Sequence, residues 1–183
     1  MSKPDKADKT NAMRLLDRAR IAYEALSYPS DGTALDAPHV AALLQEDPAR
    51  VFKTLVLVGS DGQLYACLLP GDAALDLKAA AAHFGVKSLR MAEAGKLKEL
   101  TGYVRGGCSP LGMKKALPTA ADRSALAHPY ILVSAGRIGQ QIKIDPQALA
   151  RAANLRWADL TQTASDAEAV QHLHRDVEGQ HRD

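Results

Sequence analysis

The apolar positions of the chain change their spacing along its length, and each spacing predicts a different kind of element. Across residues 11–26 they recur every three or four residues, which is the helical period. Residues 51–58 form a nearly continuous apolar and β-branched run, which is typical of a buried strand. After the turn at 59–62, residues 63–69 return as the partner of that strand in a hairpin.

The rest of the chain alternates short helical and short extended patterns. Asp36, with Pro38 in the first turn, marks a helix start, and Gly85 marks a helix end. Expected helices cover 36–45, 72–84, 92–100 and 145–154, and expected strands cover 86–91, 130–134 and 140–144. Because strands and helices do not alternate strictly, a doubly wound sheet is excluded. The pattern predicts an α+β domain around a mixed, strongly curved sheet.

The length of 183 residues is in the usual range for one domain, which we expect to cover residues 11–163. Residues 1–10 are polar and charged and are expected to be disordered. Residues 164–183 lack hydrophobic periodicity and are expected to form a flexible polar tail. This tail contains His172 and His174, but one His-x-His pair is too few ligands to predict a metal site.

The composition favours a globular cytoplasmic protein. Hydrophobic residues make up 46% of the chain and charged residues 24%, and no apolar run approaches the length that spans a bilayer. The first residues lack the apolar stretch of a secretory signal. Cys67 and Cys108 are the two cysteines, which do not make a disulfide framework. We therefore expect no membrane partner.

Positive charge is concentrated in one segment, although the whole chain has a net charge of only +2. Residues 78–115 contain 8 Lys and Arg against 2 Asp and Glu, which gives this segment a net charge of +6. A basic segment beside a candidate site is suited to a phosphate-rich partner. Solvated lysines on helices would explain the same excess.

A glycine-rich loop, residues 101–115, ends the basic segment with four glycines and Pro110. Such a loop can present backbone N–H groups to an anion or to a polarised carbonyl. Arg105, Lys114 and Lys115 lie within it, so its guest is expected to carry negative charge. The alternative is a glycine-rich connection with two solvated lysines.

Two side chains are candidates for chemistry. Lys53 interrupts the apolar strand at 51–58, and lysine is rarely buried without a partner. It either occupies a strand end with its amine in water, or provides a cation at a pocket that holds a phosphate or a polarised ester. Cys108 would need an activating base or positive charge to act as a nucleophile, which Arg105 could supply.

Three motifs resemble the YbaK/EbsC-type aminoacyl-tRNA deacylases, which are related to the editing domain inserted in bacterial prolyl-tRNA synthetases. The run Gly-Gly-Cys-Ser-Pro-Leu-Gly at 106–112 resembles the family's signature loop. Residues 51–55 resemble its lysine-bearing strand, and 133–139 resemble its late Ser-Gly turn. The motifs occur in family order, and the resemblance spans about residues 11–161. It implies a mixed sheet, partly closed into a barrel and surrounded by helices.

The resemblance also implies a function: trans-editing of mischarged Cys-tRNA(Pro), with Cys-tRNA(Cys) as a second candidate substrate. The family is thought to use the substrate's own cysteine thiol as the nucleophile, which requires no cofactor. The implied partners are mischarged tRNA(Pro) and prolyl-tRNA synthetase, and not DNA. Two alternatives remain, namely a related deacylase of Ala-tRNA(Pro) and a non-catalytic module that binds tRNA or a synthetase. The presence of Lys53 argues against the second.

Site residues follow from the same resemblance. Lys53 matches the family's critical lysine, and the N–H groups around Gly106 and Gly107 are expected to face the ester carbonyl. The implied substrate-binding residues are Tyr28, Ser109, Pro110, Leu111, Gly112, Ser134 and Gly136. The implied tRNA-binding residues are Arg105, Lys114, Lys115 and Arg137. The family usually carries a second basic residue where this chain has Ile138, and often an apolar residue in place of Cys108, which implies that this thiol is a spectator.

Overall fold

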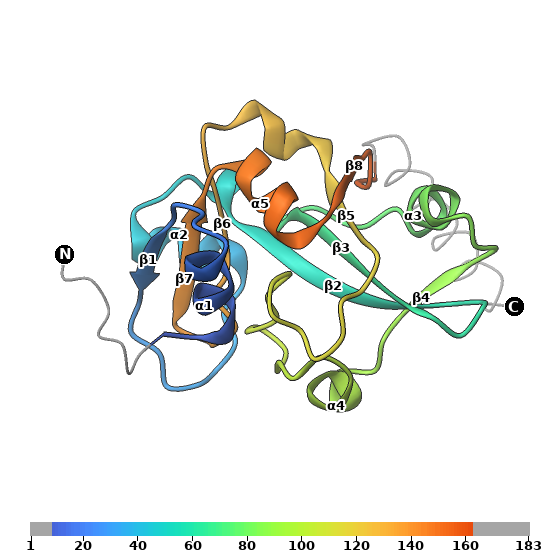
Figure 1. Ribbon diagram of the computed structural model, residues 1–183, viewed down its shortest axis with the longest axis horizontal. Helices are drawn as coiled ribbons and strands as arrows, with labels where there is room; N and C mark the ends of the chain where they lie inside the picture. The colour runs from blue at the N-terminus through green and yellow to red at the C-terminus, as the bar shows by residue number, and fades with distance from the viewer. Residues whose placement is uncertain (1–8, 163–183) are drawn as a thin grey trace, which may run out of the picture.

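The computed structural model describes residues 9–162 (Figure 1). The predictions for residues 1–8 and for the tail at 164–183, including its histidines, lie outside the described residues. The described chain contains two sheets with short helices around them (Figure 1). The expected α+β class with mixed strand directions is thereby confirmed. The strands belong to two sheets, and within residues 9–162 neither sheet closes into a barrel.

The smaller sheet has three antiparallel strands in the order β1 (Glu24–Ser27), β7 (Gln140–Ile144) and β6 (Ile131–Ser134). Its register places Ser134 at the end of β6 opposite Gln141 of β7. The larger sheet has the order β4 (Leu89–Met91), β2 (Phe52–Gly59), β3 (Leu64–Pro70), β5 (Thr119–Asp122) and β8 (Arg156–Ala158). An isolated bridge between Val51 and Leu132 joins the two sheets.

Strand direction in the larger sheet follows from how the strands are connected. A tight turn joins β2 to β3, so they pair antiparallel, with Lys53 opposite Leu69. β4 also pairs antiparallel with β2, whereas β5 and β8 add in parallel after long connections. In Figure 1, β2 is the long central strand that runs from the smaller sheet towards β4.

The helices start and stop where the local sequence provides caps. They are α1 (Asn11–Arg18), α2 (Ala37–Leu44), α3 (Leu77–Phe84), α4 (Leu97–Thr101) and α5 (Pro146–Ala153). The side chains of Asp36, Asp76 and Asp145 each accept a backbone N–H in the first turn of α2, α3 and α5. Short 3₁₀ turns cover Pro48–Arg50, Ala94–Lys96 and Arg123–Ala127.

The largest error of the pattern analysis concerns the predicted helix at 11–26. The helix ends at Arg18, Arg20 has a left-handed φ of 56°, and Glu24–Ser27 form β1 instead. Pairing with β7 satisfies the backbone of this strand and buries Leu26. The helix expected at 72–84 begins only at Leu77, whereas its predicted end at Gly85 is confirmed by a left-handed cap.

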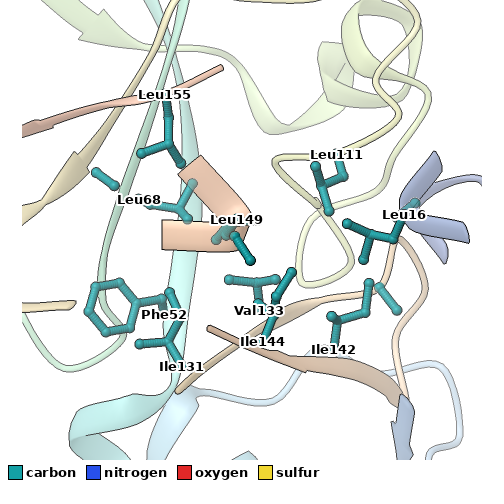
Figure 2. Packing of buried hydrophobic residues seen from close by; sticks show 14 of the residues in the cluster. Leu16, Phe52, Leu68, Leu111, Ile131, Val133, Ile142, Ile144, Leu149 and Leu155 are labelled. Atoms are coloured by element: carbon teal, nitrogen blue, oxygen red, sulfur yellow. The ribbon is translucent and has the colours of Figure 1, made fainter. Parts of the chain in front are cut away.

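The main hydrophobic core fixes the glycine-rich loop in place. Leu111 of the loop is 1% exposed and belongs to the same cluster as Leu16 of α1, Phe52 of β2 and Leu149 of α5 (Figure 2). Strands β6 and β7 contribute branched side chains to this cluster. The loop is therefore attached to the core by a fully buried leucine, which holds its remaining residues in defined positions.

Candidate active site

A cavity of about 520 Å³ brings together residues that are distant in the sequence. Lys53 enters it from β2, Tyr28 from the segment after β1, and Ser134 from the end of β6. The glycine-rich loop contributes Arg105 and Gly106. Five of the residues implied by the resemblance thus lie on one cavity, which we call the ester cavity.

Lys53 lies half-buried in the wall of the ester cavity. Its Nζ donates hydrogen bonds to the carbonyl oxygens of Gly71, at 3.1 Å, and Ala73, at 2.6 Å. Burial lowers the pKa of this amine below its usual 10.5, and the carboxylate of Asp72 acts in the opposite direction. An ammonium has three donors, so the third can point to a guest. Of the two interpretations of Lys53, the structure therefore favours an oriented cation at a cavity over a strand-end lysine with its amine in water.

Ser134 and Tyr28 offer hydroxyl groups on other walls of the ester cavity. The Ser134 Oγ accepts the N–H of Gly136 at 3.1 Å, which leaves its own hydrogen available for donation. Tyr28 is 6% exposed, and its backbone N–H donates to the carbonyl of Gly139. Among the described residues its hydroxyl has no hydrogen-bond partner. Both groups can therefore contact a polar ligand.

Two backbone N–H groups of the glycine-rich loop, those of Gly106 and Cys108, could face a developing oxyanion, whereas two others are already engaged. The Gly107 N–H donates to the Val104 carbonyl at 3.0 Å, and the Leu111 N–H to the Ser109 Oγ at 3.3 Å, so both already have acceptors. Within residues 9–162 the N–H groups of Gly106 and Cys108 have none, and both residues line the ester cavity. The geometry therefore favours these two as donors.

Gly106 is required at its position by conformation and by space. Its φ is +84°, and a Cβ there would lie 2.5 Å from the Cβ of Ala34. Only glycine combines a left-handed backbone with this close approach. The loop can thus pass over residue 34 and present its backbone to the cavity.

Tyr103 anchors the opposite side of the glycine-rich loop. Its hydroxyl donates to the Leu111 carbonyl at 2.6 Å, and Cβ atoms on Gly112 or Gly136 would lie 2.8 Å or 2.6 Å from its side chain. Several residues that the resemblance assigns to substrate binding pack here or in the interior and do not line the cavity. These are Ser109, Pro110, Leu111, Gly112 and Gly136. The first four belong to the glycine-rich loop and shape it, whereas Gly136 lies in the turn between β6 and β7 and packs against Tyr103.

Cys108 lines the ester cavity but is poorly suited to act as a nucleophile. The residue is 7% exposed, and burial raises the pKa of its thiol to about 11. At neutral pH the group is almost entirely the unreactive thiol. The spectator role implied by the resemblance agrees with this environment.

The four candidate tRNA-binding cations do not form one cluster around the ester cavity. Arg105 lines it, whereas the Lys114 Nζ donates to the Glu99 carbonyl at 3.3 Å. Lys115 lines a second cavity, next to the β2–β3 hairpin. Arg137 is exposed and lines neither of these cavities.

Two polar residues of the ester cavity were missed by the sequence analysis. Gln141 of β7 is 6% exposed, and its Oε1 has no hydrogen-bond partner among residues 9–162. Thr54 of β2 has a buried Oγ1 that likewise lacks a partner within the described chain. Such atoms are costly unless a ligand or water satisfies them. The sequence offered no clear signal for Gln141, because Gln140 and Lys143 are also polar within the strand pattern at 140–144.

Exposed side chains that line the ester cavity are both apolar and charged. Leu35 and Met91 are 37% and 47% exposed, and Arg105 is exposed as well. Among residues 9–162 no three His, Cys, Asp or Glu side chains are grouped as a metal site would require. The helices in this part of the chain are all too short or too polar to cross a membrane.

Comparison with known proteins shows the family. The family model for the aminoacyl-tRNA editing domain matches residues 32–152, and the chain belongs to this family. A relative from Enterococcus faecalis is 38% identical over 161 residues, which cover 88% of this chain and 98% of the relative. It carries the provisional name Cys-tRNA(Pro)/Cys-tRNA(Cys) deacylase EbsC. The predicted family resemblance is thereby confirmed.

Two further matches support the relation to prolyl-tRNA synthetase. A proline–tRNA ligase from Thermosipho africanus is 38% identical over 76 residues, or 42% of this chain and 13% of the ligase. A crystal structure described provisionally as a trans-editing enzyme for prolyl-tRNA synthetase superposes with a TM-score of 0.75 at 25% identity. The match covers 88% of this chain and 100% of that one. The fold expected from the resemblance is thus confirmed.

Proposed function

We propose that the protein is a trans-editing deacylase that cleaves the aminoacyl ester of Cys-tRNA(Pro), with Cys-tRNA(Cys) as a second substrate. The observation that carries this proposal is the convergence of Lys53, Ser134 and the Gly106 backbone on one cavity. An aminoacyl ester is intrinsically labile, so a site need only position it and stabilise the negative charge that develops on its oxygen. The name of the Enterococcus faecalis relative supports the same substrates.

The proposed reaction uses the thiol of the substrate. The cysteinyl sulfur attacks its own ester carbonyl, so that a carbon–sulfur bond forms and the bond to the terminal ribose oxygen breaks. The thiol proton moves to the released ribose hydroxyl, and water then opens the cyclic thioester to give free cysteine. The N–H groups of Gly106 and Cys108 would stabilise the oxyanion, and Lys53 would neutralise nearby charge. The reaction needs no nucleophile from the protein, in keeping with the raised pKa of Cys108.

A deacylation assay with a panel of mischarged tRNAs tests the proposal. Cys-tRNA(Pro) should be cleared far faster than Ser-tRNA(Pro), because a thiol has a pKa of about 8.5 and an alcohol is much less acidic. The pocket can hardly reject serine by size, since sulfur is the larger atom. Equal rates would favour attack by an activated water, and preference for Ala-tRNA(Pro) would identify the related deacylase. Failure to cleave any aminoacyl-tRNA would leave a binding module.

A further inference from the structure

A second cavity of about 520 Å³ lies against the β2–β3 hairpin, and its chemistry differs from that of the ester cavity. Its lining includes the apolar side chains of Val58 and Leu64 and the cations of Arg90, Lys96 and Lys115. We call this cavity, defined by those three cations, the basic groove. It accounts for part of the positive charge of residues 78–115, to which the ester cavity contributes only Arg105.

Glu93 is the one acidic residue among residues 9–162 that lines the basic groove, and it does not neutralise the groove. Glu93 lies 3.5 Å from the Lys96 Nζ, but the two side chains are 66% and 63% exposed. An exposed pair of this kind is weak and is screened by salt. Asp61, near the tip of the hairpin, accepts the hydroxyl of Tyr65, which lowers the pKa of this carboxyl and keeps it ionised, but Asp61 does not line the groove. The lining contains three cations against one carboxylate, so the groove keeps a net positive charge for a guest.

The basic groove and the ester cavity are neighbours along one strand. Ala92 lines both of them, while β2 provides Val56 to the ester cavity and Val58 to the groove. The register places Arg90 directly opposite Val58. From Lys53 to Val58 the strand advances by roughly 17 Å, at about 3.4 Å per residue. This is the length of a few nucleotides of a single strand.

We propose that the basic groove binds the phosphates of the RNA strand that continues from the esterified ribose in the ester cavity. This inference rests on the proposed function. A ribose whose ester lies near Lys53 is covalently joined to a chain that must leave past a neighbouring surface. The groove provides cations for the phosphates and apolar lining residues for sugars and bases. An acidic protein partner would also match the charge of the groove, but its binding would not explain why the groove lies next to the ester cavity.

The test removes two groove cations and measures RNA binding apart from chemistry. The variant is Arg90→Ala/Lys115→Ala. The matched control is Lys78→Ala/Arg151→Ala, which makes the same change in charge on exposed residues outside both cavities. Binding of uncharged tRNA is followed by fluorescence anisotropy across a salt series. Deacylation is measured on Cys-tRNA(Pro) and on the 3′-cysteinyl ester of adenosine, which has no phosphates.

The groove variant should bind tRNA at least about tenfold more weakly at 0.1 M salt. Its slope of log affinity against log salt should be shallower by about 1.4, at about 0.7 per lost contact on single strands. KM for Cys-tRNA(Pro) should rise in parallel, while cleavage of the adenosine ester stays at the wild-type rate. The control should match wild type in all measurements.

Three results would overturn the inference. The first is equal tRNA affinity in the groove variant and the control. The second is an equal loss with the adenosine ester, because the groove would then support the chemistry or the fold. The third is unchanged tRNA binding with loss only of a response to prolyl-tRNA synthetase, which would make the groove a protein-docking surface. If wild type cleaves neither ester, the proposed function fails, and tRNA binding still decides for or against the groove.

Discussion

Replacing Lys53 by alanine separates the chemistry of the ester cavity from its folding. The substitution removes the half-buried cation and its two hydrogen bonds, to the carbonyls of Gly71 and Ala73. A single preorganised donor at a developing oxyanion is worth about 10² to 10³ in kcat, or roughly 2.7–4 kcal/mol. We expect a loss of this size if Lys53 stabilises the transition state.

The effect on stability should be smaller. Hydrogen bonds to a charged group contribute about 1.5–3 kcal/mol, but the desolvation that lowers the pKa of Lys53 opposes them. We expect a net loss of about 1–2 kcal/mol, which corresponds to a fall in Tm of a few degrees for a chain of this size. The variant should therefore be folded but nearly inactive.

The assay is single-turnover deacylation of Cys-tRNA(Pro) beside a thermal melt. Lys143→Ala is the matched control, because Lys143 is also half-buried and pairs with Glu46 at 3.1 Å but does not line the ester cavity. It should lose stability and keep its rate. Lys53→Arg keeps the charge but not the position of the donor, and should recover activity only partly. Wild-type turnover in folded Lys53→Ala would refute the assigned role.

Three further outcomes are expected. Cys108→Ala should retain deacylation, and loss of activity in a folded variant would instead make Cys108 a nucleophile. Alkylation of native Cys108 at pH 8 should be roughly two hundred-fold slower than in the unfolded chain, because its pKa is about 11 in the folded protein and about 8.5 in the unfolded chain. Gln141→Leu should keep or raise Tm, because it removes a buried oxygen that has no partner among the described residues. The same variant should have a higher KM for the adenosine ester, and an unchanged KM would show that Gln141 is not part of the binding site. Gly136→Ala should lower the free energy of unfolding by about 2 kcal/mol or more, because the new Cβ would lie 2.6 Å from the Tyr103 ring. The control Gly62→Ala, at a similar φ but in open space, should lower it by about 1 kcal/mol, and equal losses would rule out the close approach.

Local signals predicted those parts of the fold that local interactions determine. The hairpin of β2 and β3, the aspartate caps and the glycine at the end of α3 all follow from neighbouring residues. Strand β1 could not be found in this way, because its apolar positions also fit a helix. What makes it a strand is pairing with β7, more than a hundred residues later. Long-range pairing of this kind overrides local periodicity.

The site shows the same division. Lys53 stood out as a charge in an apolar strand, and the glycine-rich loop stood out by composition. Gln141 and Thr54 did not, because a polar side chain in a strand is usually solvent-facing. Their position becomes informative only once the two sheets place them on one cavity with no partner for their oxygens. The sequence likewise showed the excess positive charge of residues 78–115, but it did not show which of these cations lie on one cavity.

The glycine-rich loop shows why a sequence motif alone cannot separate residues that contact the substrate from residues that hold the loop in its conformation. One side of the loop is fixed by Leu111 in the core and by the hydroxyl of Tyr103 on the Leu111 carbonyl. The other side places Gly106 and Cys108, whose N–H groups have no acceptor within residues 9–162, on the wall of the ester cavity. Both sides are needed, because donors stabilise a transition state only if they do not have to reorganise during the reaction. Substitutions on the core side should therefore reduce stability and kcat together, whereas substitutions on the cavity side should change kcat with little effect on the melt.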